Sequence, residues 1–167
     1  LRPHAFGPLE REFDLGRLSP GEFFRAVERS AGLPRIPDAV WTPAWRDIFE
    51  PDLHALEALG RLRTGVRKIL VSNTNALHWE GVRRVVDVAA LVDDLVLSFE
   101  IGAAKPERAI FDAALGRAAV PPAAALFVDD RPTYVSAART LGIPAFAATG
   151  PGAFERGLLR AGLLEPL

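Results

Sequence analysis

Four short apolar runs, separated by segments with helical periodicity, set the fold expected for most of this 167-residue chain. The runs occupy residues 68–72, 94–98, 124–129 and 143–147. The helical patterns between them lie near residues 78–89, 106–118 and 133–141. Strands that alternate with helices form parallel sheets, because each helix carries the chain back across the sheet to begin the next strand. The sequence therefore predicts an open α/β sheet flanked by helices.

The first part of the chain lacks these runs and is predicted to be helical. Residues 19–22, Ser-Pro-Gly-Glu, are typical of a capped helix start, and Gly32 is typical of the end of that helix. A second helix is expected over residues 37–49. A third should begin near residue 51 and bury a stripe of leucines, namely Leu53, Leu56, Leu59 and Leu62. We divide the chain into a helical region, residues 1–64, and an α/β region, residues 65–167.

Charge and composition argue against two classes of partner. The 20 basic and 21 acidic residues give a formal net charge of −1, so no strong field draws the chain to nucleic acid or to an anionic membrane. No apolar run reaches the roughly 18 residues of a membrane-spanning helix. The chain has no cysteine, which suits a reducing cytoplasm. We expect a cytoplasmic protein whose partners are small molecules.

A pair of acids follows one apolar run, at the edge where open parallel sheets bind their ligands. Asp129 and Asp130 end the run over residues 124–129. Adjacent carboxylates repel each other unless a cation lies beside them, and such hard oxygen ligands suit Mg²⁺. The alternative is that Asp130 only caps the helix that follows. We take Asp129 and Asp130 as candidate Mg²⁺ ligands.

Two further polar groups could bind an anion. Ser72 and Asn73 end the first apolar run, where hydroxyl, amide and backbone N–H groups can converge on a phosphate, although the same residue types are common in ordinary turns. Lys105 lies just before Pro106, which opens a helix. Lysine can neutralise phosphate as a point charge, although most exposed lysines are only solvated. Each signal is weak when it is taken alone.

The order of these groups along the chain carries more information than any one of them. Ser72-Asn73, then Lys105-Pro106, then Asp129-Asp130 resembles the second, third and fourth motifs of the haloacid dehalogenase-like (HAD) hydrolase superfamily. The similarity spans nearly the whole chain and includes residues 16–24 and 44–49, which resemble the small helical cap of one subgroup. The resemblance implies a Rossmann-like core with this cap as its N-terminal region.

The resemblance also implies a function, namely Mg²⁺-dependent hydrolysis of a small phosphate ester through an aspartyl-phosphate intermediate. Ser72 would bind the phosphoryl oxygens, Asn73 would orient the group, and Lys105 would offset charge on the phosphate and the nucleophile. Asp129 would bind Mg²⁺ directly, with Asp130 supporting the ion. The acidic pair favours a phosphatase over the dehalogenase branch, which needs no metal.

The first motif of the family is missing from the sequence. It is an apolar strand that ends in Asp-x-Asp or Asp-x-Gly, and its first aspartate attacks phosphorus. Residues 13–16, Phe-Asp-Leu-Gly, resemble it superficially. However, the preceding residues 9–12 are not a buried strand, the distance to Ser72 is too short for a strand and a cap, and residues 16–24 already match the cap. Asp14 is therefore not expected to be the nucleophile.

The missing strand would lie in the centre of the family's sheet, so two strand edges would be left unpaired. The chain also contains no methionine. We expect it to be truncated and inactive as it stands, with activity belonging to the full-length form. The alternative is a non-catalytic HAD-like protein that binds phosphate or Mg²⁺. A homodimer that covers the open edge is a further alternative, and Tyr134 stands where relatives usually carry asparagine.

The histidines and tryptophans receive structural interpretations. His54 and His78 are isolated from one another, so we expect surface or helical positions rather than a metal site. Trp41 and Trp45 fall on one helical face, and we expect them to fill the packing of the cap. The alternative is that these two rings line a substrate pocket.

Overall fold

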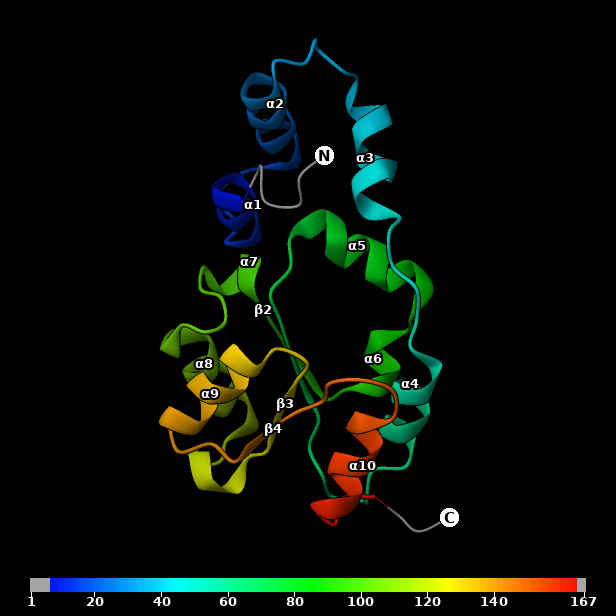
Figure 1. Ribbon diagram of the computed structural model, residues 1–167, viewed down its shortest axis with the longest axis vertical. Helices are drawn as coiled ribbons and strands as arrows, with labels where there is room; N and C mark the ends of the chain where they lie inside the picture. The colour runs from blue at the N-terminus through cyan, green and yellow to red at the C-terminus, as the bar shows by residue number, and fades with distance from the viewer. Residues whose placement is uncertain (1–6, 165–167) are drawn as a thin grey trace.

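The computed structural model describes residues 7–164 and contains two pairs of parallel strands (Figure 1). In one pair, β1 (Ile69–Ser72) lies beside β2 (Asp94–Leu97), with Ser72 opposite Leu97. In the other, β3 (Phe127–Asp129) lies beside β4 (Ala145–Ala147), with Asp129 opposite Ala147. All four strands fall within the predicted apolar runs, and each is separated from the next by helix. The predicted parallel α/β arrangement is confirmed.

The two pairs form separate sheets instead of one continuous sheet. β1 bonds only to β2 and β3 only to β4 in the sheets that the described residues form. Residues 7–164 therefore contain no strand that joins β1 to β3, which is where the sequence predicted a missing central strand. The strands are also short, at three or four residues each, because pairing stops where no neighbour supplies further hydrogen bonds.

Helices cover the strands and enclose the main apolar core. After β1, the helices of the described core are α5 (Ala76–Val85), α6 (Val88–Leu91), α7 (Ser98–Ile101), α8 (Arg108–Ala118), α9 (Pro132–Thr140) and α10 (Ala153–Arg160), with a 3₁₀ turn over Pro122–Ala124. Val96 of β2 packs with Ile110 and Phe111 of α8, and all three are almost fully buried. This packing fixes the end of β2 and the loop before α8, which carries Lys105.

From residue 7 to the first strand the structure describes four helices: α1 (Gly7–Asp14), α2 (Pro20–Ala31), α3 (Asp38–Arg46) and α4 (Leu53–Gly60). The predicted start of α2 is confirmed by a capping box, in which Glu22 N–H donates to the Ser19 hydroxyl and Ser19 N–H donates to the Glu22 carboxylate. The predicted end at Gly32 is confirmed by its left-handed backbone, φ 64°.

Aromatic rings hold the first three helices together. Phe13 of α1 stacks on Phe23 of α2 with ring centroids 4.5 Å apart. From α3, Trp45 packs on Phe23 at 4.9 Å and Trp41 stacks on Phe24 at 5.6 Å. The expectation that both tryptophans fill the packing of this region is confirmed.

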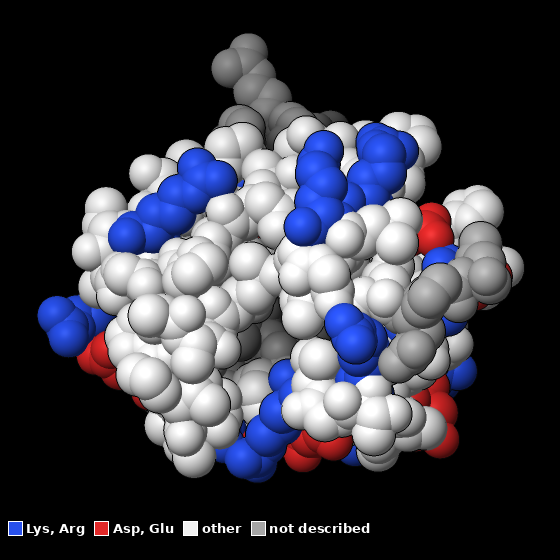
Figure 2. Space-filling view, turned by 90° about the horizontal axis from the view of Figure 1, so that it is seen from below, with Lys and Arg blue, Asp and Glu red and all other residues white. Residues whose placement is uncertain are grey.

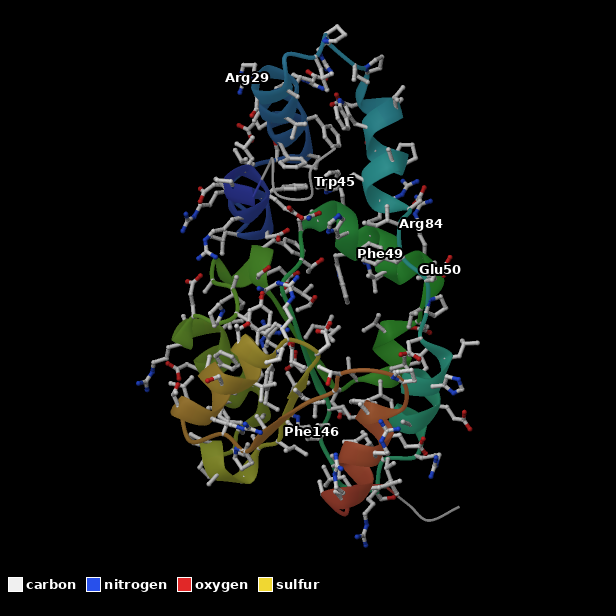
Figure 3. All side chains as sticks on the ribbon, viewed as in Figure 1. Arg29, Trp45, Phe49, Glu50, Arg84 and Phe146 are labelled. Carbon is white, nitrogen blue, oxygen red and sulfur yellow. The ribbon has the colours of Figure 1, made fainter. Side chains whose placement is uncertain are left out.

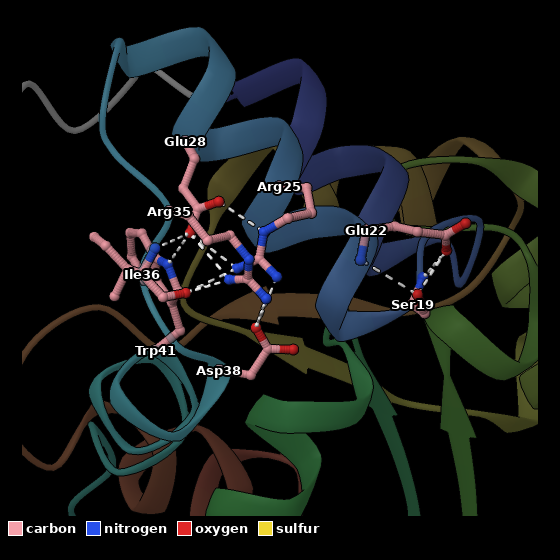
Figure 4. Close-up of polar contacts among 8 residues, drawn as sticks. All are labelled: Ser19, Glu22, Arg25, Glu28, Arg35, Ile36, Asp38 and Trp41. Carbon is pink, nitrogen blue, oxygen red and sulfur yellow. Dashed lines mark hydrogen bonds and ion pairs between the residues drawn. The ribbon is translucent and has the colours of Figure 1, made fainter.

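A buried carboxylate joins α2 to α3 (Figure 4). Glu28, which is 5% exposed, accepts hydrogen bonds from Arg25 Nε at 2.6 Å and from Trp41 Nε1 at 2.9 Å. The backbone N–H of Ile36 donates to the same carboxylate at 2.9 Å. These donors, led by Arg25, lower the pKa of Glu28 to about 2. Glu28 therefore stays ionised and holds the two helices in register.

The prediction for the leucine stripe of α4 is wrong at its first position. Leu53 is 71% exposed, and the buried residue of this helix is Ala58, which is 1% exposed. The helix packs against α10, and Leu62, just beyond it, forms an isolated bridge with Leu164. Leucines at every third residue do not stay on one face of a helix that repeats every 3.6 residues, so Leu53 lies outside the buried face. The division at residues 64 and 65 stays a prediction.

Surface properties add little that points to a macromolecular partner. No helix in the described part of the chain is long and apolar enough to cross a membrane. On the face shown in Figure 2, Lys and Arg side chains lie in separate groups around a central hollow.

Candidate active site

A buried ion pair lies between the two sheets. The Lys105 ammonium group donates to Asp129 Oδ2 at 2.6 Å and to the backbone carbonyl of Val71 at 2.9 Å. Both charged side chains are largely buried, with 9% of Lys105 and 7% of Asp129 exposed. Val71 belongs to β1 and Asp129 ends β3, so Lys105 connects strands of different sheets. The structure thus brings together Lys105 and Asp129, two candidate site residues that lie 24 positions apart in the sequence.

Asn73 holds the backbone of the loop that carries Lys105. Its Oδ1 accepts from the Lys105 N–H at 2.7 Å, and its Nδ2 donates to the Lys105 carbonyl at 2.9 Å. Nδ2 also donates to the Tyr134 hydroxyl at 3.3 Å. The amide of Asn73 is therefore committed to positioning Lys105, which leaves its backbone N–H as the group able to face a phosphate.

Tyr134 packs over the ion pair at the position where the sequence departed from the family pattern. The Lys105 ammonium lies 5.3 Å from the centre of the Tyr134 ring, within the range of a cation–π contact. The Arg131 guanidinium donates to the Tyr134 hydroxyl at 3.0 Å, and this hydrogen bond raises the pKa of Arg131. Tyr134 thus joins Arg131 and Asn73 through its hydroxyl and contacts Lys105 through its ring.

The carboxylates after β3 have different surroundings. Asp129 Oδ1 accepts from the backbone N–H of Arg131 at 2.9 Å, which fixes the orientation of the side chain. Asp130 is exposed. The residue that caps α9 is Arg131, so the alternative in which Asp130 serves only as the helix cap is not what the structure shows.

Ser72 is the last residue of β1 and lies directly before Asn73. Its hydroxyl makes no hydrogen bond with the described part of the chain, and it ends a strand whose preceding carbonyl, that of Val71, contacts Lys105. The order Val71, Ser72, Asn73 therefore places this hydroxyl at the same end of the strand pair as the Lys105–Asp129 pair. Ser72, Lys105 and Asp129 therefore lie at the same edge of the strands.

The acids present fit a magnesium ion better than a transition metal. Across residues 7–164 there is no group of three or more His, Cys, Asp or Glu side chains placed to hold a metal. Mg²⁺ commonly uses only one or two protein carboxylates and completes its shell with water and substrate phosphate. Asp129 and Asp130 supply that kind of donor set, with Asp129 held in place by Arg131 N–H.

Asp14 belongs to a different environment. It is the last residue of helix α1 and does not follow a strand, which agrees with the prediction that residues 13–16 are not the first motif. Its Oδ1 accepts from Asn75 Nδ2 at 2.9 Å, and burial raises the pKa of its carboxyl group. The backbone carbonyl of Asp14 accepts from the Ser98 hydroxyl at 2.7 Å. These contacts join α1 to the loop that follows β1 and to the start of α7.

Sequence reasoning assigned no role to three residues that shape the site. Asn75 and Ser98 are completely buried, and Tyr134 is half-buried over Lys105. The Ser98 hydroxyl accepts from Thr74 N–H at 2.8 Å, so it fixes the loop directly after Asn73. An asparagine immediately before a helix is a recognisable N-cap signal, and this signal could have identified Asn75.

Comparison with known proteins identifies the class of this site. The family model of the haloacid dehalogenase-like hydrolases matches residues 16–142. The chain therefore belongs to this hydrolase family, as the three motifs indicated. A curated relative, D-ribitol-5-phosphate phosphatase from Bacteroides thetaiotaomicron, is 30% identical over an alignment of 143 residues that covers 81% of this chain and 69% of the relative.

Solved structures agree with this assignment. A HAD family enzyme from Bacteroides thetaiotaomicron superposes with a TM-score of 0.79 at 27% identity, covering 87% of this chain and 75% of the enzyme. A mutant of it in complex with magnesium and inorganic phosphate gives 0.75 at 28% identity, covering 83% and 74%. L-2-haloacid dehalogenase from Xanthobacter autotrophicus, at 18% identity and 0.66, covers 99% and 70% and shares the fold. The HAD-like α/β fold is thereby established.

Proposed function

We propose that this chain forms most of a Mg²⁺-dependent phosphatase that hydrolyses a small phosphate ester. The observation that carries the proposal is the buried pair of Lys105 and Asp129 at the carboxyl ends of β1 and β3. A buried ammonium group beside a fixed carboxylate is suited to a site that binds both a phosphate and a divalent cation. The relative solved with magnesium and inorganic phosphate supports both ligands.

Each group has a separate part in this proposal. The Ser72 hydroxyl and the Asn73 backbone N–H donate to phosphoryl oxygens, and Lys105 offsets their negative charge. Asp129 and Asp130 hold Mg²⁺, which lowers the charge on the phosphate during transfer. The Asn73 side chain acts through Lys105, whose backbone it binds on both sides.

The nucleophile would come from a strand outside the 167 residues. The unpaired edges of β1 and β3 face the same space, and Lys105 lies at its end. A parallel strand between them would pair with both edges and place its last residues beside Lys105 and Asp129. An aspartate there would form the aspartyl-phosphate, with Lys105 offsetting its charge. This chain alone is then expected to be inactive.

The relatives support a substrate class for the proposed phosphatase. The curated relative acts on D-ribitol 5-phosphate, a small phosphorylated polyol. The second candidate function is binding of phosphate and Mg²⁺ without turnover, and it is favoured because residues 7–164 contain no strand between β1 and β3 that could carry the nucleophile. Assembly of two copies that cover each other's open strand edges would also leave the chain without a nucleophile.

Hydrolysis of p-nitrophenyl phosphate with Mg²⁺ distinguishes the phosphatase from the non-catalytic binding protein. The chain, the chain extended by its upstream coding sequence, and the extended chain with Asp129→Ala are compared at equal concentration. We expect turnover only in the extended wild type. Turnover in the unextended chain would show that Asp14 was wrongly rejected. Absence of turnover in all three, with inorganic phosphate still bound, would support the binding protein and overturn the phosphatase.

A further inference from the structure

A polar chain of three residues links the cap helices to the loop after β1. Asn75 is completely buried and caps α5, with its Oδ1 accepting from His78 N–H at 2.9 Å. Its Nδ2 donates to Asp14 Oδ1 at 2.9 Å and lies 3.1 Å from His78 Nδ1. Because Oδ1 is fixed as the acceptor, the atom that faces both Asp14 and His78 is the amide nitrogen.

This arrangement sets the proton on the histidine ring. Asn75 Nδ2 can only donate, so His78 Nδ1 must accept and carries no proton. Burial lowers the pKa of His78 to about 4, so the ring is neutral at pH 7. A neutral ring with a bare Nδ1 carries its proton on Nε2. His78 Nε2 is therefore a hydrogen-bond donor.

Two aromatic residues from the α3 side lie against this ring. Trp45 stacks on His78 with centroids 5.5 Å apart and planes 13° from parallel, and Phe49 meets its edge at 5.3 Å. Figure 3 shows Trp45 at the end of α3 and Phe49 in the segment after it, both beside α5. The helices approach closely because position 81 of α5 is glycine, where a methyl group would overlap the carbonyl oxygen of Arg46.

Neither ring donor has an acceptor in the described residues. Trp45 Nε1 and His78 Nε2 are both buried and make no hydrogen bond with residues 7–164. A buried donor without an acceptor is unfavourable, and most native structures avoid it. Packing of the two rings satisfies their apolar faces but not these N–H groups, and an oxygen-rich ligand would supply the missing acceptors.

These donors lie on the Asn75 side of the loop after β1, and Asn73 of the same loop positions Lys105. Asn73 and Asn75 are two residues apart, so their Cα atoms are at most about 7 Å from each other. One contacts Lys105, and the other contacts Asp14 and His78. A phosphate bound beside Lys105 would therefore bring the carbon chain of its ester toward the Trp45 and His78 rings.

We propose that Trp45, His78 and Asp14 bind the hydroxyl groups of the alcohol part of the substrate and thereby select a polyol or sugar phosphate. The inference rests on the proposed phosphatase function and adds the residues that recognise the alcohol. The two ring N–H groups donate to hydroxyl oxygens, and the Asp14 carboxylate accepts from a hydroxyl. Trp45 comes from α3 and His78 from α5, so parting of these two helices would open the subsite and closure would enclose the ligand.

Binding to the 167-residue chain tests this proposal without turnover. Calorimetry with Mg²⁺ compares ribitol 5-phosphate with pentyl phosphate, which has the same number of carbons but no hydroxyl, and with inorganic phosphate. The variants are His78→Phe and Trp45→Phe, which keep a ring and remove an N–H. His54→Phe, at an exposed position of α4, is the matched control.

We expect wild type to bind ribitol 5-phosphate at least about tenfold more tightly than pentyl phosphate, and each ring variant to lose about tenfold in affinity for the polyol ester alone. The control should match wild type. Equal affinity of wild type for the two esters, or equal losses for both esters in the ring variants, would overturn the proposal and leave the phosphate site intact. Failure to bind inorganic phosphate as well would overturn the proposed function, and this inference with it.

Discussion

The Lys105 ammonium lies 2.6 Å from the Asp129 carboxylate and 2.9 Å from the Val71 carbonyl, so one side chain bonds to the ends of strands in two separate sheets. Strand pairing does not connect β1 to β3 in the described residues. Lys105 therefore has a structural part as well as the proposed catalytic one. The two parts can be separated by measuring stability and ligand binding on the same variants.

Replacing Lys105 by methionine should destabilise the chain strongly. The substitution leaves the Asp129 carboxylate buried without its cation, a change that costs about 3 kcal/mol in comparable buried pairs. Urea unfolding at pH 7, followed by tryptophan fluorescence, measures the free energy of unfolding. The loss should be smaller with Mg²⁺ in the buffer, because the ion can take over part of the neutralisation of Asp129.

The matched control is Lys68→Met, because the side chain of Lys68 does not take part in the buried pair of Lys105 and Asp129. At Lys68 it is the backbone N–H that bonds to Asp93, and the substitution leaves this contact in place. The double variant Lys105→Met with Asp129→Asn should recover part of the lost stability, since it removes both charges. Equal unfolding free energies for the two single lysine variants would show that the pair contributes nothing to the fold.

Mg²⁺ and inorganic phosphate together should raise the melting temperature. At concentrations about a hundredfold above their dissociation constants, a bound ligand stabilises by about 2.7 kcal/mol, which is a rise of roughly 5 to 10 °C for a chain of this size. Asp129→Asn should remove the Mg²⁺ contribution, and Ser72→Ala should weaken the phosphate contribution. Differential scanning calorimetry at matched ionic strength measures both. A wild-type melting temperature unchanged by both ligands contradicts the proposed site.

Much of the site could be predicted from the sequence because parallel strands bring their carboxyl ends together. Ser72 and Asp129 end strands, and a loop fixed by α8 packing carries Lys105 between them. Alternation of apolar runs and helices was therefore enough to predict that the strand-end groups lie at one edge of the fold, whereas Lys105 was added by the family resemblance. The contact between Lys105 and the Val71 carbonyl depends on an unpaired strand edge, which a pattern of residue types does not encode.

Contacts made by side chains across the fold could not be predicted in the same way. The Asn73 amide binds the Lys105 backbone, a relationship over 32 positions that no local pattern contains. Tyr134 was noted only as a departure from the family, and its contacts with Lys105 and Arg131 depend on how α9 packs. The exposure of Leu53 likewise depends on which face of α4 meets α10, so periodicity alone misplaced it.

The Glu28 cluster should make the cap sensitive to acid. The pKa of Glu28 is lowered from its usual 4.5 to about 2 by Arg25 and the other donors. A lowered pKa in the folded state stabilises the fold above the unfolded value and loses that contribution as pH falls toward the folded value. Stability from Glu28 should therefore be complete above pH 4.5 and decline toward about pH 2.

Urea unfolding of wild type and Glu28→Gln at pH 6, 4 and 3 tests this expectation. The difference in unfolding free energy between the two proteins should be largest at pH 6 and should shrink at each lower pH. Glu57→Gln, at an exposed position of α4, is the control and should follow wild type throughout. A difference that stays constant across the three pH values would mean that the charge of Glu28 does not hold α2 to α3.

Substitution of Gly81 by alanine should separate α3 from α5. The added methyl group would overlap the Arg46 carbonyl oxygen and contact the Phe49 ring, and the backbone at Arg46 has little room to move because the Trp45 ring lies against His78. Forced overlap of this kind costs about 1 to 3 kcal/mol. In Gly116→Ala, the same change within α8, no atom lies in the path of the methyl group, so alanine should stabilise that helix by about 0.5 to 1 kcal/mol. The melting temperatures of the two variants should therefore shift in opposite directions. The Gly81 variant should also lose its preference for ribitol 5-phosphate over pentyl phosphate, because moving α3 takes Trp45 away from His78. Stabilisation by both substitutions would contradict this prediction, because it would show that α3 can move away from α5 without any loss of stability.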